Sequence, residues 1–228
     1  MPKLELLDSI THARLMLRPR GEPDPHFVQV VASEFAAAAS CCPIVFTKQP
    51  QTGAFYTGVM FGLQPGDTLL ADAASRGGFQ PLALQRDGFF ISEEKIVVDL
   101  DHPRISASEG EPLFDDAHMP SPGLRRVQRA LGQVQTGLDQ TERFIRTLME
   151  FKLIEPMDVT LAFRDRKRIV LEGLYTVSLD AFRDLDDSAV LQLVRAGYAQ
   201  LMYVMNASLH HIGRFASLRD AQIENVRV

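Results

Sequence analysis

The chain has 228 residues, of which 46% are hydrophobic and 23% charged, so it is long enough to bury a sizeable core in one large domain or two small ones. Its formal net charge of −5 provides no general attraction to nucleic acid, and we predict no nucleic-acid partner. The two cysteines, Cys41 and Cys42, are adjacent, which excludes an ordinary cross-linking disulfide and a zinc site of the usual spacing. A reducing compartment fits this cysteine usage.

Residues 1–26 combine scattered charges with prolines, and we expect a peripheral N-terminal arm there. The first residues lack the apolar run and the cleavage site of a signal peptide, which favours a cytoplasmic protein. The most apolar later segment, 189–212, reaches the length of a membrane span but contains Arg195, Asn206 and two histidines. These side chains are costly in lipid, so the segment predicts a buried C-terminal helix and no membrane span.

Residues 27–108 form a β-rich half, because β-branched and aromatic runs alternate there with turn residues at short intervals. The expected strands are 27–31, 43–47, 55–63, 68–71, 89–91 and 95–100, which include two hairpins. Short strands with short connections predict an antiparallel sheet or a small barrel-like unit.

An acidic joint at 109–122 follows these strands. It begins Glu-Gly-Glu-Pro-Leu-Phe-Asp-Asp, and four acids within eight residues do not form a core strand. Leu113 and Phe114 at its centre are expected to plug this polar segment into a hydrophobic surface. The acids are suited to an arginine-rich partner surface or to internal pairing with the arginines that open the following helix, and we favour the internal role.

A long helix is expected at 123–152, with Ser121 as its cap and Pro122 in its first turn. Its apolar residues follow alternating steps of three and four, as in a heptad stripe, with Thr141 as the one polar member. A narrow stripe of this kind packs on a neighbouring element or pairs with the same helix of a second copy. Homodimerisation through 123–152 is therefore one open alternative.

The helix-hairpin-helix half, 123–219, continues with a second β-hairpin around a basic turn. Its paired strands are expected at 159–163 and 169–177. Asp186 or Asp187 then caps the last helix, and residues 220–228 form a C-terminal tail. Together with the β-rich half, these elements predict a single α+β domain over 27–219.

The usual signatures of a nucleophilic enzyme, such as GxSxG and Ser-x-x-Lys, are missing from the chain. Strand alternation places Asp99 and Asp101 on one side of a strand with His102 just beyond, which makes them weak candidates for metal ligands. A non-haem iron site needs a second histidine from elsewhere, and we predict neither a metal nor a cofactor. The thiols of Cys41 and Cys42 are expected to pack at the end of an alanine-rich helix rather than to react.

Several short motifs occur along the chain in a specific order. They are Glu-Phe at 34–35, Cys-Pro-Ile-Val-Phe at 42–46, Phe-Gln-Pro at 79–81 leading to Phe-Phe at 89–90, the acidic segment 109–116, Leu-Ile-Glu-Pro-Met at 153–157, Gly-Leu-Tyr-Thr-Val at 173–177, Ala-Gly-Tyr at 196–198 and Ala-Ser-Leu at 207–209. In this order the motifs resemble the SapC-like family of bacterial proteins, over about 27–219. The chain departs from the family pattern at Cys42, Gln85 and Asp87, and it has no tryptophan.

The resemblance implies an association with bacterial surface layers, and with components encoded near halogenase-like, cupin-like oxygenase and outer-membrane receptor proteins. Neither association defines an activity. Our leading hypothesis is a non-catalytic accessory or protein-binding module in an envelope-associated or halogenase-like pathway. The alternatives are an oxygenase-like or peptide-modifying enzyme with an unidentified site of acids and histidines, and a surface-layer-associated structural protein. The candidate binding residues are Glu109, Glu111, Leu113, Phe114, Asp115, Asp116 and Arg86.

Overall fold

The computed structural model describes residues 3–21, 23–67, 69–70 and 72–226, and it confirms the predicted α+β class. The chain divides into two compact units, which are 1–23 with 80–136 and 24–79 with 137–228. This division crosses the expected β-rich half, because the first strands of that half group with the C-terminal part of the chain. A single cooperative domain stays a prediction.

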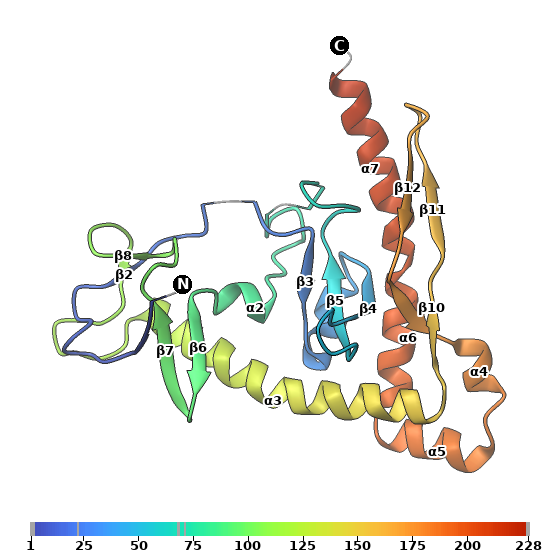
Figure 1. The fold of residues 1–228 in the computed structure, drawn as a ribbon, viewed down its shortest axis with the longest axis horizontal. Coiled ribbons are helices and arrows are strands. Elements are labelled where there is room, and N and C mark those ends of the chain that lie inside the picture. Colours follow the sequence, from blue (N-terminus) through green and yellow to red (C-terminus); the bar gives the residue numbers. More distant parts are fainter. Residues whose placement is uncertain (1–2, 22, 68, 71, 227–228) are drawn as a thin grey trace. The chain divides into compact units, whose positions relative to one another are not determined.

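The first unit contains two three-stranded antiparallel sheets, in the orders β1-β7-β6 and β8-β2-β9 (Figure 1). Its elements are β1 (Leu4–Leu6), β2 (Met16–Leu17), α2 (Leu82–Gln85), β6 (Phe89–Ser92), β7 (Lys95–Asp99), β8 (Ile105–Ser106) and β9 (Glu111–Pro112). The segment expected to be a peripheral arm supplies β1 and β2 instead. It is integral to the unit because β1 pairs with β7 and β2 lies between β8 and β9.

The hairpin of β6 and β7 confirms one of the predicted hairpins. Glu93 and Glu94 at its tip have φ angles of 49° and 63°. This left-handed conformation is what a two-residue turn between twisted strands requires. Phe89 and Val98 form a cross-strand pair in the hairpin, and both side chains are fully buried.

One cluster of buried residues forms the core of the first unit. Its members are Leu17, Phe89, Val98, Ile105, Leu113, Phe114, Leu124, Val127 and Leu131. Leu113 and Phe114 belong to this cluster, so the expected plug in the acidic segment is present. The Leu113 amide also donates a hydrogen bond of 2.9 Å to the carbonyl of Leu15. The acidic segment is therefore anchored to both the core and the N-terminal segment.

The second unit is built around a five-stranded sheet in the order β10-β13-β4-β5-β3, and it also carries a two-stranded ribbon, β11-β12 (Figure 1). The strands are β3 (Phe27–Gln29), β4 (Ile44–Lys48), β5 (Phe55–Met60), β10 (Ile154–Pro156), β11 (Val159–Ala162), β12 (Arg168–Leu171) and β13 (Tyr175–Val177). The predicted hairpin of β4 and β5 is confirmed. The predicted strand at 169–177 is divided, because Gly173 turns the chain with a φ of 71° and β13 then pairs with β10 and β4.

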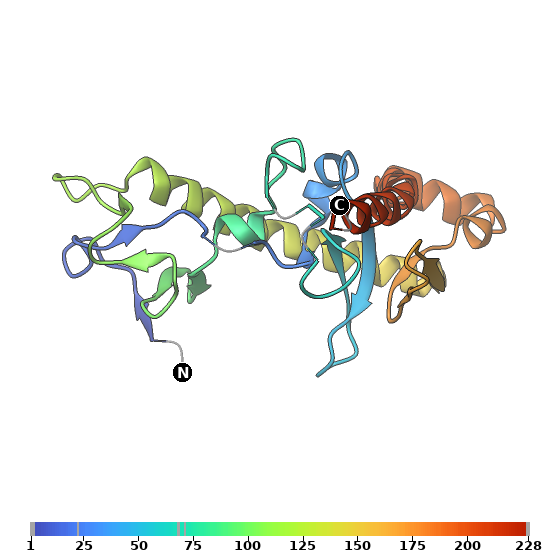
Figure 2. The same ribbon diagram turned by 90° about the horizontal axis from the view of Figure 1, so that it is seen from above.

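The helices of the second unit include three, α5 to α7, where a single last helix was expected. The helices are η1 (Ala32–Glu34), α1 (Phe35–Ala38), α4 (Leu179–Arg183), α5 (Asp187–Arg195), α6 (Tyr198–Ser208) and α7 (His210–Val226). Asp186 caps α5 as predicted, by accepting a hydrogen bond from the amide of Ala189. Gly197, with a φ of 75°, separates α5 from α6. Figure 2 looks nearly along α7, which continues through most of the expected tail.

Helix α3 (Pro122–Glu150) contributes its first half to the first unit and its second half to the second unit. The hydroxyl of Ser121 accepts a hydrogen bond of 3.2 Å from the amide of Leu124, which confirms the predicted cap. Leu138, a member of the predicted stripe, is 42% exposed. A seven-residue repeat drifts around a straight helix of 3.6 residues per turn, so the stripe does not stay on one face.

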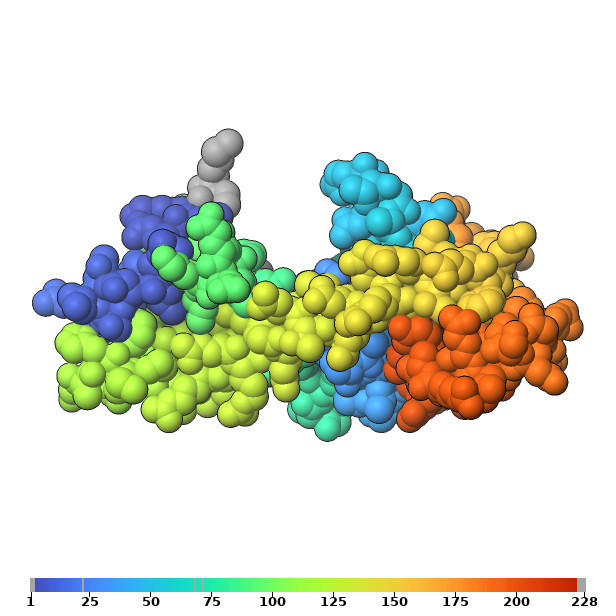
Figure 3. Space-filling model, turned by 90° about the horizontal axis from the view of Figure 1, so that it is seen from below, coloured from blue at the N-terminus to red at the C-terminus, as the bar shows by residue number. Residues whose placement is uncertain are grey.

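Phe144 takes a central position in the core of the second unit. It is fully buried, and its ring centroid lies 6.1 Å, 6.2 Å and 5.4 Å from those of Phe35, Phe46 and Tyr198, respectively. Figure 3 shows the second half of α3, in yellow, beside the orange C-terminal helices of the same unit. Helix–sheet and helix–helix packing therefore meet at this side chain.

Two further expectations concern the strand at 68–71 and the membrane. Leu69 and Leu70 form part of a turn, and Thr68 and Ala71 lie outside the described residues. Within the described part of the chain, no helix combines the length and the apolarity that crossing a bilayer requires.

Candidate functional site

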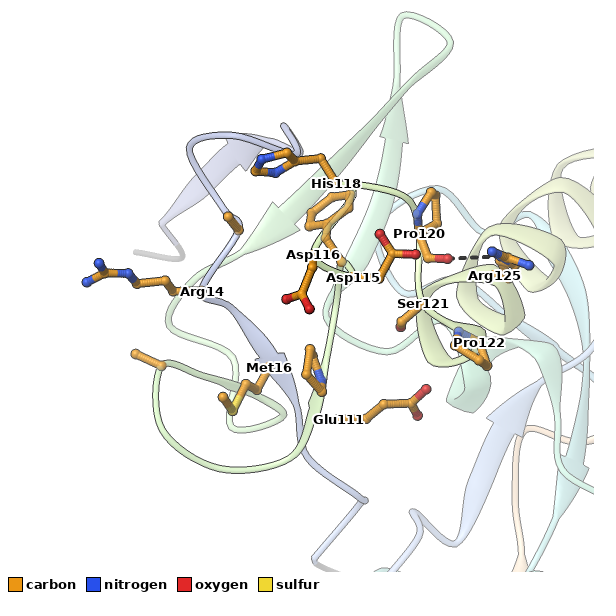
Figure 4. Close-up of a pocket in the computed structure, with 14 residues that line it drawn as sticks. Arg14, Met16, Glu111, Asp115, Asp116, His118, Pro120, Ser121, Pro122 and Arg125 are labelled. Carbon is orange, nitrogen blue, oxygen red and sulfur yellow. Dashed lines mark hydrogen bonds between the residues drawn. The ribbon is translucent and has the colours of Figure 1, made fainter.

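The acidic joint and the N-terminal segment line a surface hollow of about 750 Å³ in the first unit (Figure 4). We call it the acidic hollow. Its lining includes Arg14, Met16, Glu111, Phe114, Asp115, Asp116, His118 and Pro120. Figure 4 shows the carboxylate of Asp116 among these side chains, with Arg14 and Met16 to one side and the Pro120–Pro122 segment to the other. The hollow thus combines apolar walls with charged groups.

The loop between Phe114 and Pro120 is closed by its own backbone, since these two residues form an isolated antiparallel bridge. The carboxylate of Asp115 accepts hydrogen bonds of 3.0 Å and 2.8 Å from the amides of Ala117 and Met119. The amide of Asp115 in turn donates to the carbonyl of Met119 at 2.9 Å. Asp115 therefore holds the shape of the loop.

His118 and Arg125 fasten this loop to neighbouring segments. His118 has a φ of 60°, and its Nδ1 lies 3.1 Å from the carbonyl oxygen of Ser9, which makes Nδ1–H the donor. The Nε of Arg125 donates to the carbonyl of Pro120 at 2.9 Å, as the dashed line in Figure 4 marks. The rim of the acidic hollow is fixed on both sides.

Glu111 stabilises the beginning of helix α3. Its carboxylate accepts hydrogen bonds of 2.7 Å from the amide of Gly123 and 2.9 Å from Nη2 of Arg126. A negative charge at this end of a helix is favourable because the first amides carry a partial positive charge. A Cβ atom on residue 123 would lie 2.6 Å from an Oε atom of Glu111, so a larger residue there would displace this carboxylate.

Among the four acids of the segment, Asp116 differs from the others. Glu109 forms an exposed ion pair with Arg18 at 3.1 Å, and Glu111 and Asp115 have the partners described above. Asp116 has no hydrogen-bond or ion-pair partner among the residues that the structure describes. The favoured internal pairing with the helix arginines is seen only between Glu111 and Arg126. Asp116 is the carboxylate that is left for an external group.

Arg86 was expected to belong to the same binding site but does not line the acidic hollow. Its Nη1 donates to the carbonyl of Phe89 at 3.1 Å, and its guanidinium lies 5.7 Å from the ring centroid of Phe90. Burial lowers the pKa of this guanidinium, while the neighbouring Asp87 raises it. Glu109 and Leu113 also lie outside the lining, the latter because it is buried in the core.

The weak metal candidates have structural hydrogen bonds. The carboxylate of Asp99 accepts from the amide of Asp101 at 3.1 Å. Nδ1 of His102 accepts from the amide of Arg104 at 3.3 Å, which leaves Nε2–H to pair with Asp87 at 3.3 Å. In the described ranges, no three histidine, cysteine, aspartate or glutamate side chains come close enough to hold a metal ion.

The adjacent thiols lie at the end of α1. The two sulfur atoms are 3.5 Å apart, and each lies within hydrogen-bond distance of the carbonyl of Ala38. A hydrogen bond from Cys42 lowers the pKa of Cys41 to about 7, while the same contact and burial raise that of Cys42. Cys41 is only 5% exposed, so this pair is packed inside the second unit.

The lining residues of the acidic hollow that were not predicted from the sequence include Arg14, Met16 and His118. Arg14 and Met16 reach the hollow because β2 pairs with β9, which lies nearly a hundred residues later in the chain. No local pattern signals such a pairing. The signal available for His118 was its place between the acids and the prolines of the joint.

Comparison with known proteins gives one positive result. The family model described as SapC matches residues 7–215, nearly the whole chain. No curated protein and no solved structure matches the chain.

Proposed function

The chain belongs to the SapC family, and from that premise we propose that it is a non-catalytic accessory module that binds a protein partner through the acidic hollow. The partner segment is extended, and it carries a lysine or arginine next to an apolar side chain. We further propose that the module acts in an envelope-associated or halogenase-like pathway and works in the cytoplasm.

The observation that carries this proposal is the carboxylate of Asp116, which has no partner among the described residues and lines a hollow with apolar walls. Met16, Phe114 and Pro120 supply apolar surface on which a partner side chain can pack. A cationic group that reaches Asp116 forms a charge-assisted hydrogen bond, which is about twice as strong as a neutral one. Binding sites typically combine a mainly apolar lining with a few fixed polar groups, and this hollow has that character.

Among the histidines considered for an enzyme site, His102 supports the non-catalytic proposal, and the others each have one ring nitrogen near a backbone carbonyl. His102 uses both ring nitrogens in structural contacts, and His118 binds the carbonyl of Ser9. Nδ1 of His210 lies 2.6 Å from the carbonyl of Ala207, and Nε2 of His211 lies 3.0 Å from that of Ala39. Each of these rings is engaged with the fold around it.

Affinity purification from the source cells, with quantitative mass spectrometry, tests the proposal. The bait is the full chain in three forms, namely wild type, Asp116→Lys and the matched control Asp139→Lys. Asp139 is an exposed acid on α3 that does not line the acidic hollow. We expect at least one protein to be enriched by the wild type and the control but lost from Asp116→Lys. Equal recovery of every protein by all three baits would contradict the proposal.

Self-association through α3 is a further proposal, and the structure limits the surface available for it. Most of the predicted stripe is buried inside the two units, as at Leu124, Leu131 and Leu148, and Leu138 is the exposed member. Light scattering on wild type and Leu138→Arg tests it. A wild-type dimer that becomes monomeric in the variant supports pairing through this helix, and a monomeric wild type excludes it.

A further inference from the structure

A second, smaller hollow in the first unit has a volume of about 90 Å³. We call it the arginine hollow. Its polar lining comes from Gln80, Gln85, Arg104 and Arg126, and its lining includes none of the carboxylates that the structure describes. One water molecule needs only about 10–15 Å³ on the same measure, so a group with several oxygen atoms fits. The lining chemistry selects for an anion.

The guanidinium of Arg104 is held in place by the backbone around it. Its Nη1 lies within 3.3 Å of the carbonyls of Leu84, Gln85 and Asp87, to which it donates. Its Nη2 has no hydrogen-bond partner among the described residues. Burial lowers the pKa of this guanidinium, while Asp87 raises it. Arg104 therefore offers a fixed cationic donor.

The surroundings of Arg104 contain more cations than carboxylates. Asp87 already pairs with Arg20 and with His102. The Nε atoms of Arg18 and Arg86 are buried and have no hydrogen-bond partner among the described residues, although Nη2 of Arg18 pairs with Glu109 at the surface. An anion added beside this group of cations is therefore electrostatically favourable.

Arg126 supplies the second cation of the arginine hollow, and it is exposed where Arg104 is half-buried. Its side chain is 62% exposed, and its ion pair with Glu111 is of the surface kind that contributes little. The first amide of α3, that of Gly123, already donates to Glu111. The guanidinium groups, rather than the helix end, must therefore carry the binding.

We propose that the arginine hollow binds a phosphate-sized oxyanion, with Arg104 and Arg126 donating to its oxygen atoms. The oxyanion is inorganic phosphate or the phosphate of a small monoester. Glu111 competes with it for Arg126. Glu111 lies between this site and the acidic hollow, but oxyanion binding holds or fails independently of the protein-binding function, which rests on Asp116.

Calorimetric titration of the full chain at pH 7 and constant ionic strength tests the proposal, with inorganic phosphate and glycerol phosphate as separate ligands. We expect one saturable site, with the two ligands competing for it. Arg126→Gln removes one charged donor, which weakens binding by about tenfold or more. Glu111→Gln removes the competing carboxylate and should strengthen binding several-fold, by about the worth of a surface ion pair.

Arg129→Gln is the matched control, because Arg129 is an exposed arginine one turn further along α3 that does not line the arginine hollow. The phosphate affinity of this variant should stay within about twofold of that of the wild type, because a charge outside the hollow is largely screened by salt. Thermal unfolding of each variant confirms that it is folded. Equal weakening in Arg126→Gln and Arg129→Gln, or no saturable binding of either ligand, would overturn the proposal.

Discussion

Arg76 in the second unit and Asp116 in the first unit show opposite uses of a charged side chain. Arg76 is 1% exposed, and it donates to Asp24 at 2.6 Å and to the carbonyls of Leu70 and Phe79 at 2.6 Å and 3.1 Å. Asp116 has no such partner among the described residues and faces a hollow. A charge whose donors are all paired within the fold is needed for stability, whereas a charge without a partner on a fixed rim is available for binding.

The largest loss of stability is expected from a substitution of Arg76. Arg76→Met removes the guanidinium from Asp24, whose side chain is only 9% exposed, and from two carbonyls. Breaking a buried ion pair by removing one partner costs about 3–5 kcal/mol. Urea unfolding of the full chain measures this loss. Arg195→Met, at an exposed position on α5, serves as the control and should change stability by less than about 1 kcal/mol.

Leu113→Ala tests whether the Leu113 side chain anchors the acidic segment, and with it the rim that carries Asp116, to the core of the first unit. Leu113 is fully buried in the core cluster of the first unit. Truncating a buried leucine costs about 2–5 kcal/mol, and here it also loosens the rim of the acidic hollow. Leu138→Ala, at a leucine that is 42% exposed, should cost less than about 1 kcal/mol. Similar urea midpoints for the two variants would show that the Leu113 side chain is not part of the core.

A pH effect is expected at His211 in the second unit. Nε2–H of His211 donates to the carbonyl of Ala39, and its Nδ1 is buried without a hydrogen-bond partner in the described part of the chain. Burial, with the nearby charges of His210 and Arg214, lowers the pKa of His211 below its ordinary value near 6.5. The neutral ring therefore contributes stability that is present above that value and is lost as the pH falls through it, because the unfolded chain takes up the proton first.

Urea unfolding at pH 7.5 and pH 5.5 measures this effect. The wild type should lose stability on acidification, and His211→Gln, whose side-chain amide can still donate to Ala39, should lose less. The difference between the two proteins isolates His211 from the other titrating groups. An identical pH dependence in both would mean that His211 is solvated in the native state.

The smallest change in the free energy of unfolding is expected from Asp116→Asn. Since Asp116 has no partner among the described residues, its charge contributes nothing to stability that the neutral amide would lose. The free energy of unfolding should change by less than about 0.5 kcal/mol, as for most surface substitutions. A loss above about 1 kcal/mol, which is the worth of a typical hydrogen bond, would reveal an internal partner for Asp116.

Elements that depend on neighbouring residues, such as helix caps and tight hairpins, were predicted correctly from the sequence. Ser121 and Asp186 cap the helices that follow them, and the hairpin around Glu93 and Glu94 forms as expected. The sequence did not predict the strands at the N-terminus, because β1 and β2 pair with residues some 80 to 100 positions away. Gly197 was read as part of a helix, since a glycine within an apolar run carries no mark of its left-handed φ.

The candidate site was predicted only in part, because some of its residues are brought together by contacts between distant parts of the sequence. The acidic segment identified Glu111, Phe114, Asp115 and Asp116, all of which line the acidic hollow. Which acids would be internally paired depended on tertiary contacts, such as that between Glu111 and Gly123. Arg86 was grouped with them by the order of motifs, although its contacts are with β6.

The most direct test of the central claim, that Asp116 in the acidic hollow is a binding charge, is fluorescence anisotropy with a labelled peptide of alternating lysine and leucine. The wild type and Asp139→Lys should bind the peptide with equal affinity. Asp116→Lys should bind at least about tenfold more weakly, the worth of one charge-assisted hydrogen bond. Equal affinity for all three proteins, or equal binding of a peptide with glutamate in place of lysine, would contradict the claim.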